Sequence, residues 1–536
     1  MKASLIDYAR LPEQSRLFLE FLRFEGVQQF YNSYHRGCAA LKELADHRLT
    51  ADFPRREIAH ALQNFNRRVE NDLTALSNAA RIVKPQTLVV VTGQQAGLFG
   101  GPALTFYKAI TAILIANKLN AEGFSAVPLF WVASEDHDFE EIRGTSFLDP
   151  RGRQLDLQIN SESALPLTAA QRHTGDTAPM IQQCAEFLSQ TDHSAVVIDW
   201  LRNSYRSDTT IAEAFTRLLA KVFGPAGLVF IDASDPAVRK LAQNHFRTAV
   251  EEAEKINEVL KQRVKQLKES GFEPQAHWEE DYTLLFHVTE RGRRAIRRSN
   301  GNFVSEEQKW STRDLLGEIS QSPERFSPSA LLRPIIQDAI LPSVLYIGGA
   351  AEIAYFAQVH ALAKIFGWAP VIQPRLAVTL LDSRAARYLE RNDLQAPDAF
   401  CTLEELQEKM ARSRLGEGVL DHWKQHVSNA ARELDSLTDL ASRIDATLGK
   451  AWQLSRRKID YQIQKTERKL LRASAQKSER IQEQAAFLHS MLYPCGTLQE
   501  RRINFLSFYA RYGPRLMNNL GSLSPCEKSH YVVTLE

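Results

Sequence analysis

Apolar residues recur at three- and four-residue spacing through the first part of the chain. This spacing places apolar side chains on one face of a helix, so it predicts helices over residues 12–82. Pro85 interrupts the pattern, and the apolar run TLVVV that follows at residues 87–91 is continuous. A short continuous run of this kind is typical of a strand that is buried on both faces.

A strand–helix–strand unit follows from the next segments. Residues 102–121 predict a helix with Pro102 in its first turn, where a missing N–H is tolerated. The run AVPLFWVAS at residues 126–134 predicts a second buried strand. Two buried strands joined by a helix form a parallel unit, so we expect an α/β fold with a parallel sheet.

The middle of the chain predicts an insertion into this sheet. Residues 226–234 predict a strand that ends in an acidic loop, and residues 236–269 predict one strongly charged helix. The segments YTLLFHVTE and GRRAIRRSNGNFV predict a small antiparallel piece with glycine turns. The sheet pattern then returns at residues 343–367 and 369–382.

A proline-free stretch at residues 418–492 predicts a coiled coil of one or two helices. Apolar or small residues recur there at alternating spacings of four and three, with one shift, at positions 437, 441, 444, 448 and 451 and then 459, 463, 466, 470 and 473. Gly449 is a candidate bend. The alternative is a long helix that packs on its own domain.

Composition narrows the class of protein. A chain of 536 residues is too long for one core and indicates about two to four domains. The net charge of +2 gives no electrostatic argument for a nucleic acid or an anionic membrane as partner. The N-terminus lacks the apolar core of a signal peptide, and no apolar run is long enough to span a bilayer. The cysteines are odd in number, widely spaced and without metal-binding spacing (Cys38, Cys184, Cys401, Cys495 and Cys526), which predicts a reduced, cytoplasmic protein.

A glycine-rich loop links the first predicted strand to its helix. Glycine permits close approach of a ligand to the backbone, and the start of a helix attracts anions. The residues that we expect to bind a phosphate or a carboxylate there are Gly93, Gln94, Gln95, Gly97, Gly100, Gly101 and Lys108. The loop matches neither a Walker A motif nor a dinucleotide fingerprint. The plain alternatives are a tight turn between packed elements and, for Lys108, a solvated side chain.

An acidic cluster follows the second predicted strand. Because carboxyl ends of parallel strands meet at one edge of a sheet, we expect this cluster beside the glycine loop. Its candidate members are Glu135, Asp136, His137, Asp138 and Glu141, which have the chemistry to hold a metal, orient an amine or transfer protons. Asp138 also fits an ordinary helix cap, with Glu141 three residues later.

A third strand-to-helix junction lies at YIGGAAEIAYFAQ, residues 346–358. Gly348 and Gly349 repeat the glycine pattern, and three polar residues follow on roughly one helix face, Glu352, Tyr355 and Gln358. They would recognise an amine or hydroxyl groups, unless this face simply lies in water. Arg375 follows the next strand and is suited to bidentate binding of a phosphate or carboxylate. The basic run at residues 291–301 has no interleaved aromatic residues and indicates a solvated hairpin.

The segments VTGQQAGLFGGP, VPLFWVASEDHDFEEI and YIGGAAEIAYFAQ resemble, in this order, the BshC family of bacillithiol biosynthesis. The resemblance implies a Rossmann-like core similar to class I aminoacyl-tRNA synthetases, with inserted connecting-peptide domains and a C-terminal coiled coil that supports a homodimer. The expected parts are a helical segment (1–85), the first half of the core (86–150), core strands with the insertion (151–340), the second half of the core (341–400), the coiled coil (401–495) and a tail (496–536).

The resemblance also implies the reaction. A cysteine ligase of this family joins the carboxyl group of cysteine to the amine of glucosaminyl-malate, the last step of bacillithiol synthesis. Such a carboxylate needs activation, so ATP (or ADP) and Mg²⁺ are the candidate cofactors, with no metal site of the protein's own assigned. His137 is the expected base, and Asp136 or Asp138 would orient it or bind Mg²⁺.

Three other classes compete with this interpretation. A metal-dependent hydrolase would need further ligands beyond the acidic cluster, such as His360 or Asp382. A non-catalytic nucleotide-binding scaffold would bind a ligand and dimerise without forming a product. A tRNA-charging enzyme is disfavoured because the chain lacks evident HIGH and KMSKS motifs and a basic surface.

Overall fold

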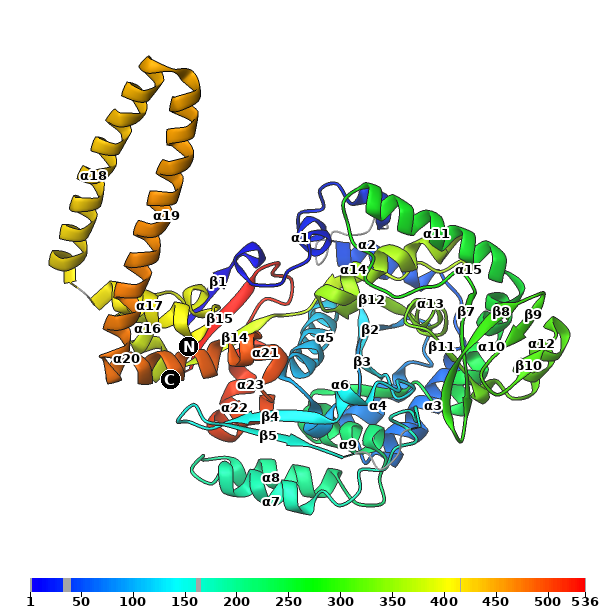
Figure 1. Ribbon diagram of the computed structural model, residues 1–536. Coiled ribbons are helices and arrows are strands. Elements are labelled where there is room, and N and C mark those ends of the chain that lie inside the picture. The colour runs from blue at the N-terminus through cyan, green and yellow to red at the C-terminus, as the bar shows by residue number, and fades with distance from the viewer. Residues whose placement is uncertain (1, 32–39, 161–164, 415, 536) are drawn as a thin grey trace.

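The protein consists of a body built around a parallel sheet and a long helical hairpin that projects from it (Figure 1). The computed structural model describes residues 2–31, 40–160, 165–414 and 416–535. Within these ranges, none of the helices combines the length and the apolar character needed to cross a bilayer.

The central sheet has five strands, and every pairing in it is parallel, which confirms the expected α/β class. Its strands are β2 (Thr87–Gln94), β3 (Ser125–Val132), β6 (Val229–Asp232), β12 (Ser343–Gly348) and β13 (Ile372–Pro374). These strands are buried almost throughout. Their sequences are therefore continuous apolar runs, because helices cover both faces of the sheet.

The strand order β13-β12-β2-β3-β6 is that of a doubly wound Rossmann sheet. From β2 the chain proceeds outward through β3 and β6, and it then returns to the other side of β2 to form β12 and β13. The connections that leave β2 and β12 therefore diverge. A crevice opens at the carboxyl ends of these two neighbouring strands, which is where ligands bind in such sheets.

The N-terminal helices pack on the sheet and on its connecting helices. They are α1 (Arg16–Arg23), α2 (Leu41–Leu49), α3 (Arg55–Arg68) and α4 (Leu73–Arg81). The connecting helices are α5 (Ala103–Ala121) between β2 and β3, and α14 (Ala350–Val359) and α15 (Ala363–Phe366) between β12 and β13. α2 contacts β12, α3 and α4 contact β6, and α1 contacts α14.

Two long insertions interrupt the sheet. The first, between β3 and β6, contains α6 (Phe139–Ile142), β4 (Gly144–Leu148), β5 (Gln154–Gln158), α7 (Ala178–Phe187), α8 (Ser194–Ser204) and α9 (Ile211–Phe223). The second, between β6 and β12, contains α10 (Pro236–Glu251), α11 (Ala253–Glu269), β7 (Tyr282–Thr289), β8 (Gly292–Ser299), β9 (Asn302–Val304), β10 (Lys309–Trp310), α12 (Thr312–Gln321), β11 (Phe326–Pro328) and α13 (Arg333–Ile340). The single charged helix expected at 236–269 is wrong, because Glu252 separates α10 from α11.

The basic run at residues 291–301 contains the whole of strand β8, which belongs to an antiparallel sheet. Three of its five arginines form ion pairs with carboxylates on neighbouring segments. Arg294 pairs with Glu306 at 2.9 Å, and Arg297 pairs with Glu279 at 2.6 Å. This part of the surface is therefore partly charge-compensated.

A second sheet joins the two ends of the chain. It contains β1 (Lys2–Ile6), β14 (Val378–Asp382) and β15 (His530–Leu535) in the order β1-β15-β14. The sequence pattern missed β1 and β15 and assigned residues 369–382 to the main sheet. Only β13 belongs there, since β14 pairs with a strand about 150 positions later, and no local pattern reports so distant a partner.

The expected coiled coil is confirmed as an antiparallel hairpin of α18 (Gly416–Ile444) and α19 (Ala446–Gln476) (Figure 1). Asp445 ends the first helix and caps the second, where its carboxylate accepts the Thr447 N–H at 2.6 Å. The apolar repeat at 437–451 therefore runs across a turn rather than along one helix. Gly449 makes no bend; a methyl group there would clash with Ser442, so glycine permits the close approach of the two helices.

The remaining helices lie at the base of the hairpin and against the body. They are α16 (Ser383–Arg391), α17 (Leu403–Arg414), α20 (Glu479–Leu492), α21 (Gln499–Arg502), α22 (Phe505–Tyr512) and α23 (Pro514–Gly521). Among the cysteines, Cys184, Cys401 and Cys495 are free thiols. Cys526 is disulfide-bonded, so the expectation of a fully reduced chain is wrong for this residue. Cys38 lies outside the described residues.

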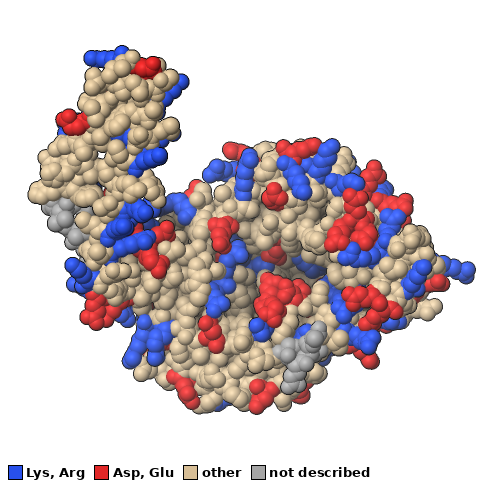
Figure 2. Space-filling model, viewed as in Figure 1, with Lys and Arg blue, Asp and Glu red and all other residues tan. Residues whose placement is uncertain are grey.

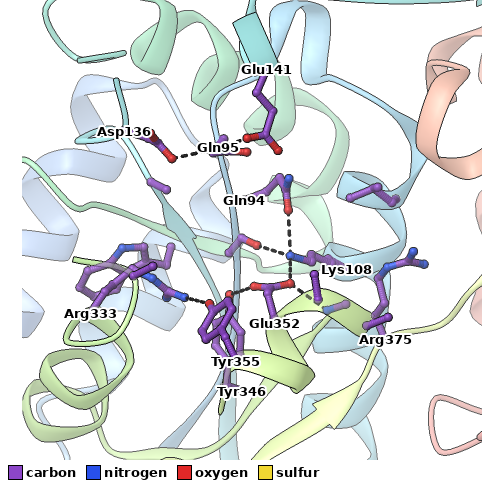
Figure 3. A pocket seen from close by; sticks show the side chains of 18 of the residues that line it. Gln94, Gln95, Lys108, Asp136, Glu141, Arg333, Tyr346, Glu352, Tyr355 and Arg375 are labelled. Carbon is purple, nitrogen blue, oxygen red and sulfur yellow. Dashed lines mark hydrogen bonds and ion pairs between the residues drawn. The ribbon is translucent and has the colours of Figure 1, made fainter. Parts of the chain in front are cut away.

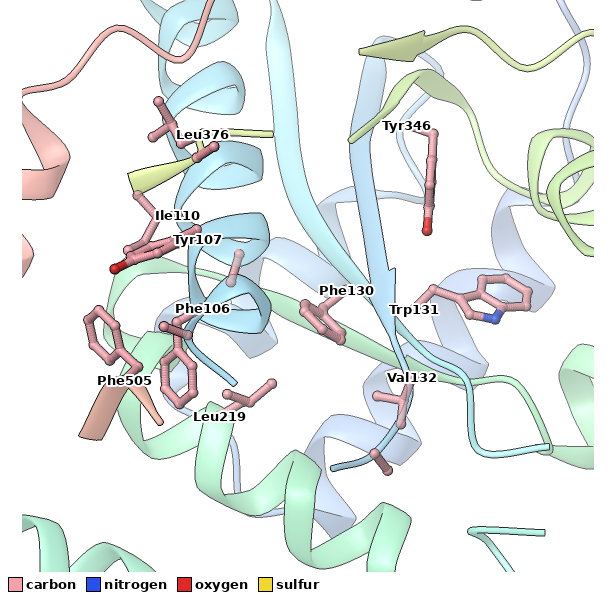
Figure 4. Close-up of a cluster of buried hydrophobic side chains, with 14 of the residues drawn as sticks. Phe106, Tyr107, Ile110, Phe130, Trp131, Val132, Leu219, Tyr346, Leu376 and Phe505 are labelled. Atoms are coloured by element: carbon pink, nitrogen blue, oxygen red, sulfur yellow. The ribbon is translucent and has the colours of Figure 1, made fainter. Parts of the chain in front are cut away.

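The C-terminal segment completes the core beneath the sheet (Figure 4). Phe505 of α22 stacks on Phe106 of α5 with ring centroids 4.6 Å apart and planes 14° apart. Tyr107 meets the same ring edge-on at 6.0 Å. Phe505 and Phe106 are fully buried, so the sheet and the C-terminal helices share one apolar core.

Replacing Phe505 by alanine tests this shared core. A cavity in a close-packed core removes both transfer and packing energy, so we expect F505A to lower the free energy of unfolding by about 3–5 kcal/mol. The measurement is a urea denaturation midpoint. Leu73→Ala serves as the control, because Leu73 is 80% exposed and its loss should change stability little. Equal midpoints for F505A and wild type would contradict a shared core.

Candidate active site

A cavity of about 340 Å³ lies at the crevice between β2 and β12. We call it the first cavity. The glycine loop supplies Gln94 and Gln95, the acidic cluster supplies Asp136 and Glu141, and the third junction supplies a further group that includes Glu352. Three segments that are far apart in the sequence therefore open onto one pocket, at the place where a doubly wound sheet binds its ligands.

The glycine loop is a packed turn rather than an open phosphate cradle. The N–H groups of Gly97, Gly100 and Gly101 donate to carbonyls within the loop, at 2.9–3.1 Å. The first N–H of α5, on Ala103, donates to the Ile503 carbonyl at 2.9 Å. The C-terminal segment thus occupies a position at the helix start where an anion was expected to bind.

The glycines of this loop are explained by backbone geometry. Gly100 and Gly101 have φ angles of 90° and 70°, which side-chain-bearing residues rarely adopt. A methyl group on Gly93 would lie 2.7 Å from the Trp131 carbonyl oxygen, and one on Gly97 would lie 2.9 Å from the Gly101 Cα. Gly93 still lines the first cavity, whereas Gly97 and Gly101 line a neighbouring one.

Lys108 reaches back from α5 and connects the loop to the third junction (Figure 3). Its Nζ donates to the Gly93 carbonyl and to Gln94 Oε1, each at 2.8 Å, and forms an ion pair with Glu352. Lys108 is buried, and burial lowers its pKa although the charge of Glu352 opposes this. Every N–H of the ammonium is engaged, so Lys108 has a structural role. We call the ion pair of Lys108 with Glu352, together with the hydrogen bonds of Lys108 to Gly93 and Gln94, the brace.

Glu352 is the acceptor at the centre of this brace. Burial alone would raise the pKa of Glu352, but the charge of Lys108 and the hydrogen bonds that it accepts hold the pKa below its usual range. Gly349 N–H donates to its Oε2 at 2.8 Å, and the Tyr346 hydroxyl donates to its Oε1 at 2.5 Å. Both oxygens are therefore occupied, and Glu352 fixes the start of α14 against α5.

Arg333 forms the wall opposite the glycine loop. One of its terminal nitrogens donates to the Tyr355 hydroxyl at 2.8 Å, and its guanidinium lies 5.3 Å from the centre of the Tyr346 ring. Within the described part of the chain Arg333 forms no ion pair with a carboxylate. It therefore presents a positive charge to the cavity, which the negative charges of Glu352 and Glu135 oppose without a direct ion pair.

Gln95 joins two carboxylates of the acidic cluster. Its amide nitrogen donates to Asp136 Oδ2 at 2.8 Å and to Glu141 Oε2 at 2.7 Å (Figure 3). Burial opposes ionisation of Asp136, yet the hydrogen bonds from Gln95 and the Asp138 N–H and the charge of Arg293 lower its pKa. Burial raises the pKa of Glu141. One wall of the cavity thus carries two carboxylates suited to an ammonium group.

The other members of the cluster point elsewhere. His137 lies on the wall of neither cavity; its Nδ1 is 3.4 Å from Arg293 Nη1, and burial together with the Arg293 charge lowers its pKa. Asp138 precedes α6 and makes no capping hydrogen bond through its side chain. Glu135 is buried, which raises its pKa, and its Oε2 has no hydrogen-bond partner among the residues described.

Three further candidates have structural partners. Gln358 faces away from the cavity and exchanges hydrogen bonds with the backbone of Ala276, at 2.9 and 3.1 Å. Gly348 allows close packing against Ile372, where a methyl group would lie 2.7 Å from Cδ1. Arg375 lines the cavity, but its terminal nitrogens bind Glu500 at 2.6 and 2.9 Å.

The ion pair between Arg375 and Glu500 does not use the Nε atom of Arg375. The guanidinium holds the pKa of Glu500 at about 2, against the effect of burial. Arg375 Nε is buried and has no hydrogen-bond partner within the described ranges, and the same is true of Trp131 Nε1. Both residues line the first cavity, so these two donors remain for a ligand.

Sequence patterns missed several residues of the site. Arg333, Trp131, Tyr346 and Arg501 all line the first cavity. Trp131 and Tyr346 fall within the motifs that we had singled out, at strand ends where side chains face the crevice. Arg333 and Arg501 follow no local motif and reach the cavity only through the tertiary fold.

A second cavity, of about 530 Å³, adjoins the first. The two cavities share five residues, which we call the neck: Gln94, Gln95, Leu104, Glu141 and Arg501. Part of its remaining wall comes from the β4–β5 hairpin. The two cavities therefore adjoin at the neck, and together we call them the cleft.

Metal ligands do not assemble at this cleft. Across the described residues, no group of three or more histidine, cysteine or acidic side chains is placed to hold a metal ion. His360 bonds the Pro370 carbonyl at 2.7 Å, and Asp382 pairs with Arg511 at 2.8 Å. The additional ligands that a metal-dependent hydrolase would require are thus already bonded to other groups.

Acidic and basic side chains are interspersed over the face of the protein shown in Figure 2.

Comparisons with known proteins agree over the whole chain. A family model described as "Bacillithiol biosynthesis BshC, N-terminal Rossmann-like domain" matches residues 1–376, and one described as "Bacillithiol biosynthesis BshC, C-terminal coiled-coil domain" matches residues 378–535. A protein of Koribacter versatilis (strain Ellin345) named "Putative cysteine ligase BshC" is 33% identical over 532 residues, covering 98% of this chain and 99% of that protein. A protein of the same name from Solibacter usitatus (strain Ellin6076) is 33% identical over 520 residues, with 96% of each chain covered.

A solved structure titled as an arginyl-tRNA synthetase of Campylobacter jejuni also overlaps with this chain. It is 10% identical, covers 84% of this chain and 95% of its own, and has a TM-score of 0.23. That likeness is too weak to support an argument. The similarity to class I synthetases stays a prediction, and the Rossmann-like assignment follows from the strand order and the family model.

Removing the buried ammonium tests the brace. We expect Lys108→Met to lower the free energy of unfolding by about 3–5 kcal/mol, because it leaves the Glu352 carboxylate buried without its partner. The double variant K108M/E352Q should lose less than the sum of the single variants, as urea denaturation would measure. The control is Lys118→Met on the same helix, where the ion pair with Glu122 is exposed and contributes about 0–1 kcal/mol. Strict additivity of the two single variants would contradict the brace.

Proposed function

Because the chain belongs to the BshC family of bacillithiol biosynthesis, we propose that this ligase joins the carboxyl group of L-cysteine to the amine of glucosaminyl-malate, the last step of that synthesis. The observation that carries the proposal is the mixed charge of the first cavity. Asp136 and Glu141 face it from one side, and Arg333 faces it from the other. Such a cavity is suited to a substrate that carries both an ammonium and a carboxylate group.

The size and position of the cavity support the same reaction. A volume of about 340 Å³ accommodates a small amino acid with a group attached to its carboxylate. The divergent ends of β2 and β12 leave this volume open at the edge of the sheet. Two buried donors, Trp131 Nε1 and Arg375 Nε, remain on its wall to orient an acyl oxygen.

Amide formation needs an activated carboxyl group, and ATP with Mg²⁺ is the proposed source of activation. The residues of the first cavity fit the binding of ATP with Mg²⁺ in part. The internal hydrogen bonds of the glycine loop leave it poorly suited to a polyphosphate, so phosphate groups would instead face Arg333. Both oxygens of Asp136 and of Glu352 are already engaged, so Mg²⁺ would be held mainly by the phosphate groups themselves and by water.

The helical hairpin supports the proposal of a homodimer. Large apolar side chains are exposed along it, namely Leu437, Leu440, Ile444, Leu448, Leu454 and Tyr461. Solvent contact of this much apolar surface is unfavourable, and a second copy of the hairpin would cover it. Action in the cytoplasm, and the absence of nucleic-acid and membrane partners, stay predictions.

Omission of single components tests the proposed reaction. We expect purified protein, incubated with cysteine, glucosaminyl-malate and ATP–Mg²⁺, to yield the amide that mass spectrometry detects as the sum of both substrates less one water. Leaving out either substrate, or ATP, should abolish this product. Binding of ATP without any amide would instead identify a nucleotide-binding scaffold.

A negative charge introduced on the helical hairpin tests whether the hairpin forms the dimer interface. Leu440 is 55% exposed within one chain. We expect L440E to shift wild-type dimer to monomer in analytical ultracentrifugation, because a carboxylate would be buried without a partner in the interface. Gln425→Glu adds the same charge at an exposed polar position of the hairpin and should leave the dimer intact. A wild-type monomer, or a dimeric L440E, would contradict the proposal.

A further inference from the structure

The second cavity has the lining of a polar binding site. Hydroxyl, amide and carboxylate groups project from the β4–β5 hairpin, including Thr145, Ser146, Asp156 and Gln158. Arg501 and Arg502 contribute positive charge from α21, while Glu140, Glu141 and Asp156 contribute negative charge. A hydroxyl-rich ligand that carries both an amine and carboxylate groups matches this mixed lining, whereas an apolar ligand does not.

An unsatisfied hydroxyl group also points to a ligand there. Thr105 lies in the first turn of α5 on the wall of the second cavity and is 1% exposed. Its Oγ1 has no hydrogen-bond partner within the described residues. A buried hydroxyl without a partner is costly, and a polar ligand group would satisfy it.

Glu141 differs from the other carboxylates of the first cavity. Asp136 has both oxygens engaged, by Gln95 and by the Asp138 N–H. Glu352 likewise has both oxygens engaged. Glu141 uses Oε2 to accept from Gln95, while Oε1 has no partner among the residues that the structure describes. It is also the carboxylate that lies on the neck.

Arg501 completes the neck. It lines both cavities and forms no side-chain hydrogen bond or ion pair within the described part of the chain. Its neighbour Arg502 is instead held by Asp156 at 2.8 Å. Arg501 is therefore free to bind an anionic group of either ligand, close to the carboxylate of Glu141.

We propose that the second cavity receives the amine acceptor, a hydroxyl-rich amine that carries carboxylate groups, and that Glu141 accepts a proton from this amine at the neck. The inference rests on the proposed ligase function, and it assigns the first cavity to the activated acyl donor. Arg501 binds a carboxylate of the acceptor. The base is thus Glu141 rather than His137, which lies outside the cleft.

The proposed amide-forming step requires one proton acceptor. The amine nitrogen attacks the carbonyl carbon of an acyl phosphate or acyl adenylate derived from ATP, and the C–N bond forms. The C–O bond to the phosphate or nucleotide breaks, and its electron pair leaves with that oxygen. The proton lost by nitrogen passes to Glu141 Oε1. Burial raises the pKa of Glu141, which makes its carboxylate a stronger base.

A blocked second cavity tests the position of the acceptor. We expect Gln158→Trp to weaken binding of glucosaminyl-malate at least about tenfold in calorimetric titration, with the KM for cysteine unchanged. Arg151→Trp is the control, because Arg151 is exposed in the turn of the same hairpin and lines neither cavity. Wild-type affinity in Q158W, in a protein that forms the amide, would overturn this inference alone. Failure of wild type to form any amide would overturn the ligase function as well.

The pH dependence tests the base. Wild-type kcat/KM should rise with pH as Glu141 loses its proton, and E141Q should lose this rise together with about 10²–10⁴-fold in kcat. An affinity of E141Q for glucosaminyl-malate within a few-fold of wild type would show that the loss is catalytic rather than structural. If E141Q kept the rise of kcat/KM with pH while His137→Asn lost it, the base would be His137 and the inference would be overturned.

Discussion

The buried ion pair between Lys108 and Glu352 is the interaction on which the site depends. It fixes the start of α14 to the second turn of α5 and, through the Gly93 carbonyl, to the end of β2. The sheet alone would leave these elements free to diverge, because its topology opens a crevice at this point. A charge pair in this crevice holds its two walls at a set distance without filling the space that a ligand needs.

The cleft is assembled from both family domains. Glu500 neutralises Arg375 and accepts the Val378 N–H at 3.0 Å, while the adjacent Arg501 turns toward the neck. The Ile503 carbonyl occupies the first N–H of α5. A short C-terminal segment thus both stabilises the glycine loop and supplies a charge to the site. The Rossmann-like part would lack a wall of its own cleft without it.

Local patterns predicted the parts of the fold that depend on local chemistry. Continuous apolar runs marked β2 and β3, and strand-end motifs marked the shared pocket. The same patterns failed where a distant partner decides the outcome. Strand β15 pairs with β1 and β14, and Asp445 turns an apparently continuous repeat into a hairpin. The role expected for Lys108 changed for the same reason, because its partner lies more than two hundred positions away in the sequence.

The sheet β1-β15-β14 has a consequence for the order in which the protein matures on the ribosome. Strand β1 is synthesised before β15, yet β15 is its only neighbour in this sheet among the described residues. The nascent β1 therefore remains without this partner until β15 has been synthesised. Pairing of the two strands is a late step of folding, because most of the described chain lies between them.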